Sequence, residues 1–230
     1  MHSILFTTAL RERSKGGVVD MKRSGFDTMS PYAYPFYICM HPRDGFLELK
    51  ANKKGSLSVV SIILALWLAV EVIRRTATGY DLNGFNPEDA SLLRTAVITI
   101  IIYFMVCLSN WCFCTLLDGK GRLRDICVVA AYALVPYVIV RAITIPLSWV
   151  FTGDEGVFLN YAVIISEVWC AFIAFSGLEE IHEYSIPKTV LAIVLTFVGL
   201  VIMLFIALML LMLFQQVYFF IVTVLFEAKY

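Results

Sequence analysis

Two charged side chains lie inside long uncharged stretches of the sequence and are the first candidates for chemistry. Arg141 and Glu167 each sit deep in an apolar segment, where an ionisable residue is costly unless it has a function or a partner. Asp154 lies midway along the short connection between these segments, thirteen positions from each residue. Equal offsets in antiparallel neighbours mean equal depth, and the guanidinium fork suits a carboxylate. We therefore predict that Arg141 and Glu167 form a buried ion pair.

The predicted pair has two alternative roles. It can hold two membrane helices together as a packing contact, which we favour, or it can belong to a proton or substrate path. Glu71 is the third ionisable residue in an apolar segment, and it lies near the end of that segment. Its carboxylate is expected to reach the headgroups or to pair with Arg74 or Arg75, three and four positions later.

A cluster of acidic residues surrounds His182. Glu179, Glu180 and Glu183 share one short stretch with it, whereas metal sites usually draw ligands from positions i and i+4 of a helix or from separate elements. We interpret the stretch as a solvated charge run. His182 is expected to hydrogen-bond a loop carbonyl.

His41 precedes Pro42, which places it in an extended or turn segment. It could act as a general base only beside a nucleophile. The sequence contains no nucleophile elbow, phosphate loop, dinucleotide fingerprint or His-Glu-x-x-His motif. We interpret His41 as an interfacial anchor together with Tyr34, Phe36 and Tyr37. No catalytic residue, metal ligand or cofactor is predicted, and we do not expect an enzyme.

Membrane-spanning helices must position these side chains, because the composition is far from that of a soluble domain. Hydrophobic residues make up 60% of the 230 residues and charged residues only 16%, against roughly 45–50% and 25% in soluble domains. The formal net charge is zero. This composition excludes a soluble enzyme domain, a disordered chain and a nucleic-acid binder with a basic face.

Five apolar segments are each close to the roughly 20 helical residues that cross a hydrocarbon core of about 30 Å. We expect helices, because each backbone polar group must find its partner within its own segment, and the runs lack the alternation of membrane β-strands. Pro136 and Pro146 are expected to kink the third segment. The predicted fold is an all-α membrane protein, a polytopic bundle of five transmembrane helices with a preceding interfacial segment. The apolar segments are 57–73, 95–114, 126–151, 157–178 and 189–214.

The last segment leaves two alternatives open. Residues 189–226 form a run of 38 residues without a charge, which is about 57 Å of helix and nearly twice the core thickness. The run can be one long helix whose end leaves the bilayer or lies along its surface, or two short spans that turn at Gln215 and Gln216. We favour one helix, because no Gly, Pro, Asn or Asp marks a turn there.

Lysine and arginine are distributed unevenly between the two sides of the predicted membrane. The N-terminal region, the loop 118–124 and the loop 179–188 together carry thirteen, and the opposite side carries four. The positive-inside rule then places the N-terminus in the cytoplasm and, after five crossings, the C-terminus outside.

The chain divides into three predicted regions. Residues 1–33 are expected to be a mobile cytoplasmic tail, in which either Met1 or Met21 is the true start. Residues 34–56 form a juxtamembrane segment, and residues 57–226 form the membrane domain. In the juxtamembrane segment Phe46, Leu47 and Leu49 can dip into the membrane interface beside basic residues. The alternative is a plain linker.

Several short motifs around the five segments carry a family resemblance. They are Tyr34-Pro35-Phe36-Tyr37, His41-Pro42-Arg43-Asp44-Gly45-Phe46, Leu117-Asp118-Gly119-Lys120-Gly121, Tyr132-Ala133-Leu134-Val135-Pro136-Tyr137, and Ile181-His182-x-Tyr184-Ser185 with Lys188. In this order, over about residues 34–214, the chain resembles the Yip family of Ypt-interacting membrane proteins, and specifically its bacterial branch.

The resemblance implies a five-span fold with a cytoplasmic N-terminus. Eukaryotic members are adaptors that bind small GTPases in vesicle traffic, and bacteria lack that traffic, so this partner class is not carried over. The same motifs supply our candidates for partner-facing or interfacial side chains. These are His41, Pro42, Asp44, Phe46, His182 and Tyr184.

We expect the protein to be an integral membrane scaffold or accessory subunit that associates with other membrane proteins, with a transporter complex among the candidates. The alternative is a component of a membrane transporter or channel that uses buried charges, although five spans form no even-numbered inverted repeat. Beyond the lipid bilayer and membrane proteins, we predict neither a nucleic-acid partner nor a small-molecule substrate. The absence of Asn-x-Ser/Thr acceptors favours a bacterial cell membrane over a eukaryotic secretory-pathway membrane.

Overall fold

The structure, a computed structural model, describes residues 30–52, 55–78, 91–151 and 155–227. Nearly all of the predicted tail lies outside these residues. The described part forms eight helices. Five candidate spans are long and apolar enough to cross a membrane, which confirms the predicted all-α membrane fold.

The five spans begin and end close to the predicted segments. The first two are α4 (Leu57–Ala77) and α5 (Leu92–Leu116). The third consists of α6 (Leu123–Ala133) and α7 (Val135–Leu147), and α8 (Gly156–His182) and α9 (Ile186–Glu227) complete the set. Each backbone amide in such a helix bonds within its own segment, which is what hydrocarbon requires.

The third span is interrupted at Leu134, two residues before Pro136. Proline has no amide hydrogen to donate and its ring clashes with the preceding turn, so a helix bends or breaks there. The chain continues at once, because the amide of Val138 donates to the carbonyl of Leu134 at 3.0 Å. The second proline, Pro146, lies in the last turn of α7. The expected kink is therefore confirmed at Pro136.

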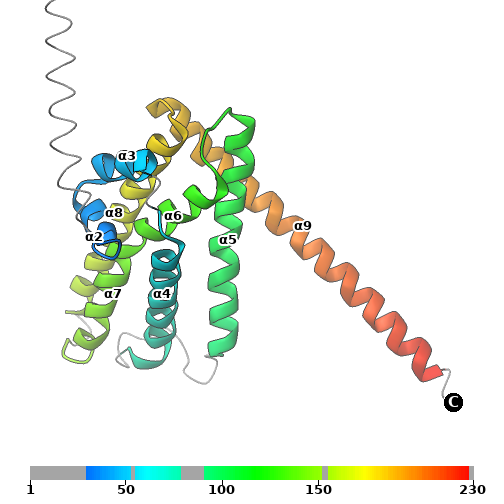
Figure 1. The fold of residues 1–230 in the computed structure, drawn as a ribbon. Helices are drawn as coiled ribbons and strands as arrows, with labels where there is room; N and C mark the ends of the chain where they lie inside the picture. Colours follow the sequence, from blue (N-terminus) through cyan, green and yellow to red (C-terminus); the bar gives the residue numbers. More distant parts are fainter. Residues whose placement is uncertain (1–29, 53–54, 79–90, 152–154, 228–230) are drawn as a thin grey trace, which may run out of the picture.

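The core of the bundle is centred on α8. This helix contacts α3, α6 and α7, while α4 packs on α6 and α7 and α5 packs on α6 (Figure 1). Helix α3, the start of α6 and the end of α8 all lie in the upper part of the bundle in Figure 1. Helix α6 contributes more residues to the core than any other helix, and α2, α3, α4, α5, α7 and α8 complete it. Its fully buried members include Phe46, Val128, Val129, Tyr132 and Ile173.

Two short helices precede the first span and pack against the bundle. They are α2 (Tyr34–Met40) and α3 (Pro42–Asn52). Phe46 is fully buried and Leu49 nearly so, whereas Leu47 is 53% exposed. Phe46 and Leu49 therefore face protein, and neither the interfacial alternative nor the plain linker describes them. The space for the Phe46 ring comes from Gly177, where an added Cβ would lie 2.9 Å from the ring.

The last span is one unbroken helix of 42 residues, and no turn occurs at Gln215 and Gln216. At 1.5 Å per residue its length is about 63 Å. Its first part packs on α5, where the Ser109 hydroxyl donates to the Thr196 carbonyl at 2.7 Å and Asn110 Nδ2 donates to Thr196 Oγ1 at 3.0 Å. The single-helix alternative is confirmed.

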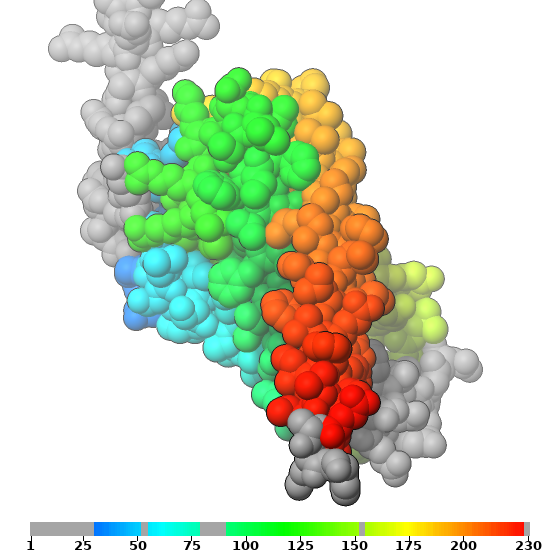
Figure 2. Space-filling view, turned by 90° about the vertical axis from the view of Figure 1, so that its right-hand side faces the viewer, coloured from blue at the N-terminus to red at the C-terminus, as the bar shows by residue number. Residues whose placement is uncertain are grey.

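The rest of α9 leaves the bundle. The buried residues of this helix are Thr189, Ala192, Thr196 and Gly199, and none of the described residues after Gly199 is buried. Figure 1 shows the helix diverging from α5, and Figure 2 shows its outer face, orange to red, with no other segment lying over it. We call residues 207–227 the distal half of α9.

Candidate functional site

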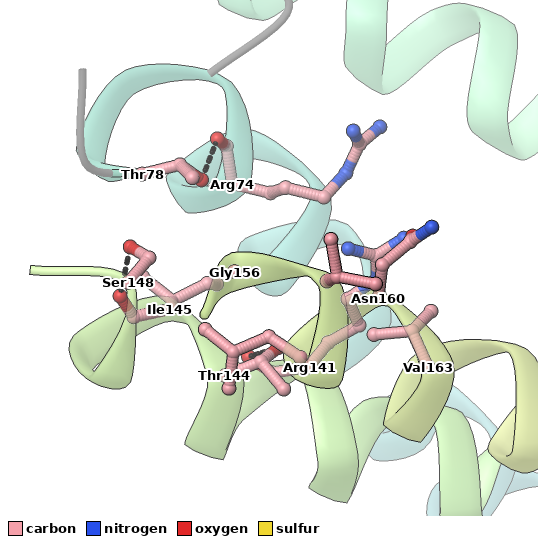
Figure 3. Close-up of a pocket in the computed structure, with 11 residues that line it drawn as sticks. Arg74, Thr78, Arg141, Thr144, Ile145, Ser148, Gly156, Asn160 and Val163 are labelled. Carbon is pink, nitrogen blue, oxygen red and sulfur yellow. Dashed lines mark hydrogen bonds between the residues drawn. The ribbon is translucent and has the colours of Figure 1, made fainter. Parts of the chain in front are cut away.

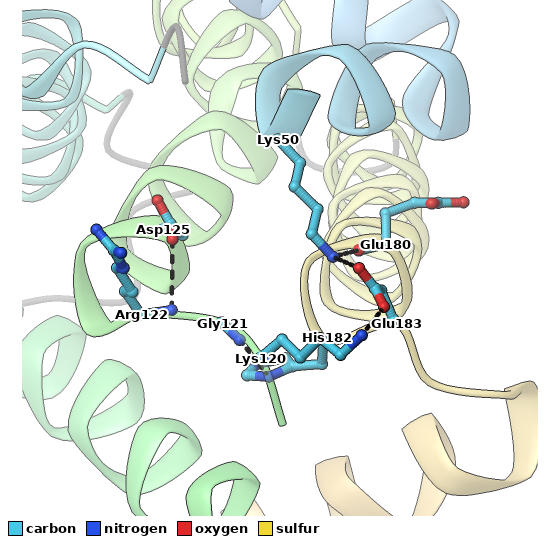
Figure 4. Close-up of polar contacts among 8 residues, drawn as sticks. All are labelled: Lys50, Lys120, Gly121, Arg122, Asp125, Glu180, His182 and Glu183. Atoms are coloured by element: carbon cyan, nitrogen blue, oxygen red, sulfur yellow. Dashed lines mark hydrogen bonds and ion pairs between the residues drawn. The ribbon is translucent and has the colours of Figure 1, made fainter. Parts of the chain in front are cut away.

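Three segments that are far apart in sequence meet at one end of the bundle. We define the polar junction as the C-terminal part of α3, the α5–α6 loop (117–122) and the α8–α9 connection (179–185). Lys50 Nζ donates to the carbonyl of Glu180 at 3.1 Å and to the carboxylate of Glu183 at 2.7 Å. Lys120 pairs with the other oxygen of the Glu183 carboxylate (Figure 4). The three basic segments that we assigned to one side of the membrane thus share one end of the structure.

Glu183 joins these segments and also ends α8. It has a left-handed backbone with φ of 56°, and its amide donates to the carbonyl of Glu179, an arrangement that closes the last helical turn. Its carboxylate is about half exposed. Hydrogen bonds from Lys120 and then Lys50 lower the pKa of Glu183 to about 2, because both partners favour the ionised form.

His182 is buried at the centre of the junction. Its Nδ1 accepts a hydrogen bond from the amide of Gly121 at 3.3 Å. We expected the ring to donate to a loop carbonyl, and this expectation was wrong. A neutral imidazole that accepts at Nδ1 carries its proton on Nε2, and Nε2 is buried without a hydrogen-bond partner. The ring stacks on Tyr184 with centroids 5.1 Å apart.

Two glycines allow the α5–α6 loop to reach this histidine. An added Cβ at Gly119 would lie 2.5 Å from His182 Nδ1 and from the Tyr184 hydroxyl, and one at Gly121 would lie 2.6 Å from Ile181. The Tyr184 hydroxyl donates to the carbonyl of Cys114 at 2.9 Å. Burial raises the pKa of Tyr184 to about 12. The Gly-x-Gly spacing is therefore a consequence of close packing between the loop and the α8–α9 connection.

The candidate residues near α3 divide into one buried residue and a surface group. Phe46 belongs to the core. Pro42 is the first residue of α3 and Asp44 lies in its first turn, where a negative charge is favourable at the positive end of the helix dipole. His41 is exposed and stacks on Tyr37 with centroids 4.9 Å apart. His41 and Asp44 lie at the surface, whereas His182 and Tyr184 are built into the junction.

The structure does not bring Arg141 and Glu167 together. Glu167 is exposed on α8. The guanidinium of Arg141 lies over the ring of Tyr137, 5.4 Å from the ring centroid. Matched depth along two antiparallel helices fixes how far each residue is from the connection, but it does not fix the direction in which each side chain points.

A different polar cluster forms in the membrane region, around Glu71. One carboxylate oxygen accepts from the Tyr137 hydroxyl at 2.5 Å, and the other accepts from Arg74 Nε at 3.1 Å and Nη2 at 2.8 Å. Of the alternatives expected for Glu71, the structure shows the i to i+3 pairing with Arg74. The contribution of Tyr137 was missed, because it depends on how α4 packs on α7 and leaves no signal in the spacing along the chain.

The described side chains provide no metal centre. Within residues 30–52, 55–78, 91–151 and 155–227, no group of three or more His, Cys, Asp or Glu side chains could hold an ion. All six cysteines are free, and two of them, Cys107 and Cys114, are buried. Of the acidic side chains near His182, Glu183 pairs with Lys50 and Lys120, and Glu179 lies near Arg43. Arg43 Nη2 lies 3.5 Å from Glu179.

A family comparison agrees with the motifs and with the fold. The model of the Yip1 domain matches residues 36–226, from α2 to the end of α9. Among curated proteins and among solved structures, nothing matches the chain. The matched region contains α3, all five spans and the polar junction. The match covers far more than half of the sequence, and the chain therefore belongs to the Yip1 domain family.

Proposed function

We propose that this protein is a non-enzymatic scaffold or accessory subunit that binds other integral membrane proteins through the distal half of α9. In this proposal the protein resides in a bacterial cell membrane with its N-terminus in the cytoplasm. The observation that carries the proposal is the divergence of α9 from its own bundle. The helix is about 63 Å long, and its last buried residue is Gly199.

The length of α9 supports a protein partner. A hydrocarbon core about 30 Å thick covers roughly 20 residues of an upright helix, so an upright α9 places apolar turns beyond the core. A strongly tilted α9 keeps more of those turns inside, but it also draws Gln215 and Gln216 toward hydrocarbon. Either arrangement leaves apolar turns outside the hydrocarbon or glutamine amides close to it, and lipid alone solvates both poorly.

Gln215 and Gln216 are the side chains that we expect to hydrogen-bond the partner. Both side chains are exposed, and neither is hydrogen-bonded to any other described part of the chain. Apolar side chains gain little by leaving lipid for another helix, so association in membranes depends on close packing and on interhelical hydrogen bonds. A neighbouring transmembrane helix with polar side chains at the same depth would satisfy the amides of Gln215 and Gln216.

Photocrosslinking in cells tests this proposal with the full chain. A photoreactive residue replaces Phe220 in the distal half of α9, and the matched controls replace Ile101 on α5 and Ile165 on α8, which are also exposed and apolar. We expect a discrete protein adduct from Phe220 that is lost in Gln215→Leu/Gln216→Leu, and lipid adducts from both controls. Equal protein adducts from all three positions would contradict the proposal.

The transporter alternative predicts a different result. It requires the protein to move a solute without a partner, so purified protein in liposomes would show flux that depends on Glu71 or Arg141. Our proposal predicts no flux from the protein alone.

A further inference from the structure

A polar cavity lies at the end of the bundle opposite the polar junction. It has a volume of about 300 Å³, opens to the outside, and is lined by the end of α4, the second half of α7 and the start of α8 (Figure 3). The cavity lies near the ends of α4 and α7 and the beginning of α8. The residues that define its chemistry are Arg74, Thr78, Arg141, Thr144, Ser148 and Asn160.

The lining is cationic. Two arginines contribute to it, and no aspartate or glutamate is among its described residues. In Figure 3 the side chains of Arg74, Arg141 and Asn160 reach toward the same region from three helices. Guanidinium and amide N–H groups are donors, and the first turn of α8, which begins at Gly156, adds the positive end of a helix dipole.

Arg141 has unused bonding capacity in this cavity. Its Nε is buried and has no hydrogen-bond partner. The carboxylate of Glu71 is close to this group, but its oxygens already accept from Tyr137 and Arg74. The two arginines and Glu71 together carry one net positive charge. An arginine near hydrocarbon is expected to pair with a negative charge. The Glu71 carboxylate is shared with Arg74, so it does not serve Arg141 alone.

We propose that this cavity binds a phosphate group, either in the headgroup of an anionic phospholipid or as free phosphate. The planar guanidinium fork recognises phosphate through two parallel hydrogen bonds, and amide donors with a helix start complete such anion sites. The hydroxyls of Thr144 and Ser148 now donate to carbonyls of their own helix, and rotation of either one would add a donor. This proposal is independent of the role of α9.

Binding to the purified full chain in detergent tests the proposal. The probes are inorganic phosphate, short-chain phosphatidylglycerol and a diacylglycerol of the same chain length, which lacks phosphate. We expect phosphatidylglycerol to bind and the diacylglycerol not to bind, and Arg141→Gln to weaken the binding at least tenfold. Binding of inorganic phosphate as well would assign the site to free phosphate, and its absence would assign the site to the lipid.

The matched control is Arg94→Gln, because Arg94 is an exposed arginine on α5 outside the cavity lining. It should bind like wild type. If Arg141→Gln does not yield a monodisperse protein, Asn160→Leu removes a second donor from the lining and should weaken binding in the same direction. Equal binding of the diacylglycerol, absence of binding by both phosphate probes, or full binding by a folded cavity variant would overturn the proposal.

Discussion

Tyr137 on α7 donates a hydrogen bond of 2.5 Å to the carboxylate of Glu71 on α4. These residues are 66 positions apart, and their contact joins the first span to the second half of the third. A charged acceptor makes this bond stronger than one between neutral groups. Because Arg74 holds the other oxygen, both oxygens of the Glu71 carboxylate already accept hydrogen bonds.

We expect the Glu71–Tyr137 contact to stabilise the bundle by about 1.5–3 kcal/mol, the usual range for a hydrogen bond to a charged group. A double-mutant cycle with Glu71→Gln and Tyr137→Phe, followed by thermal unfolding in detergent, measures the coupling. Tyr161→Phe is the control, since Tyr161 is exposed on α8. Additive losses from the two changes would show that the contact contributes nothing.

The close approach of the α5–α6 loop to His182 predicts that Gly119→Ala is destabilising. The new Cβ would lie 2.5 Å from His182 Nδ1 and 2.7 Å from the carbonyl oxygen of Cys114, so the loop must move. Overpacking of this kind costs about 1–3 kcal/mol. Gly55→Ala is the milder control, because the nearest atom to its new Cβ would be a Val128 methyl carbon at 3.2 Å. Equal stability of the two variants in unfolding would contradict this packing.

The junction is expected to loosen in acid through Glu183. Its pKa is lowered to about 2 in the folded protein, whereas a glutamate in an unfolded chain has a pKa of about 4.3. The stabilisation is therefore complete above pH 4.3, declines as the pH falls, and is lost as the pH passes through 2. Hydrogen exchange of residues 42–52 and 117–122 at stepped pH measures this loss.

The control for the pH prediction is Glu183→Gln. This variant lacks the titrating group, so it should exchange faster than wild type at pH 7 and show a smaller change toward low pH. An identical pH profile in both proteins would assign the acid sensitivity to other groups.

Burial of Phe46 distinguishes a packed α3 from a lipid anchor. Because the ring is fully buried against Gly177, Phe46→Ala should reduce the free energy of unfolding by about 3–5 kcal/mol. Leu47→Ala on the exposed face should have little effect. If α3 were only an interfacial anchor, neither variant would lose this much stability.

Features that depend on the chemistry of one segment could be predicted from the sequence. The spans follow from apolar runs of sufficient length, the break in the third span follows from Pro136, and the single helix α9 follows from the lack of turn residues at Gln215. Glu71 with Arg74 was predictable because both lie on one helix, where positions three apart are neighbours.

Features that depend on how helices rotate against each other could not be predicted. Arg141 and Glu167 have matched depth, yet Glu167 points outward. The burial of Phe46 required knowledge that Gly177 opens a space on α8. The polarity of the His182 bond required the path of the α5–α6 loop, which brings the amide of Gly121 to the ring. These are properties of packing between segments.

The central claim, that the distal half of α9 holds another integral membrane protein, is tested most directly by purification in mild detergent. The full-length wild type should retain one integral membrane protein at a fixed molar ratio. Gln215→Leu/Gln216→Leu keeps the length and apolar character of the helix, and it should lose that protein while remaining folded. Retention of the same protein at the same ratio by this variant, or isolation of wild type without any integral membrane partner, would contradict the account.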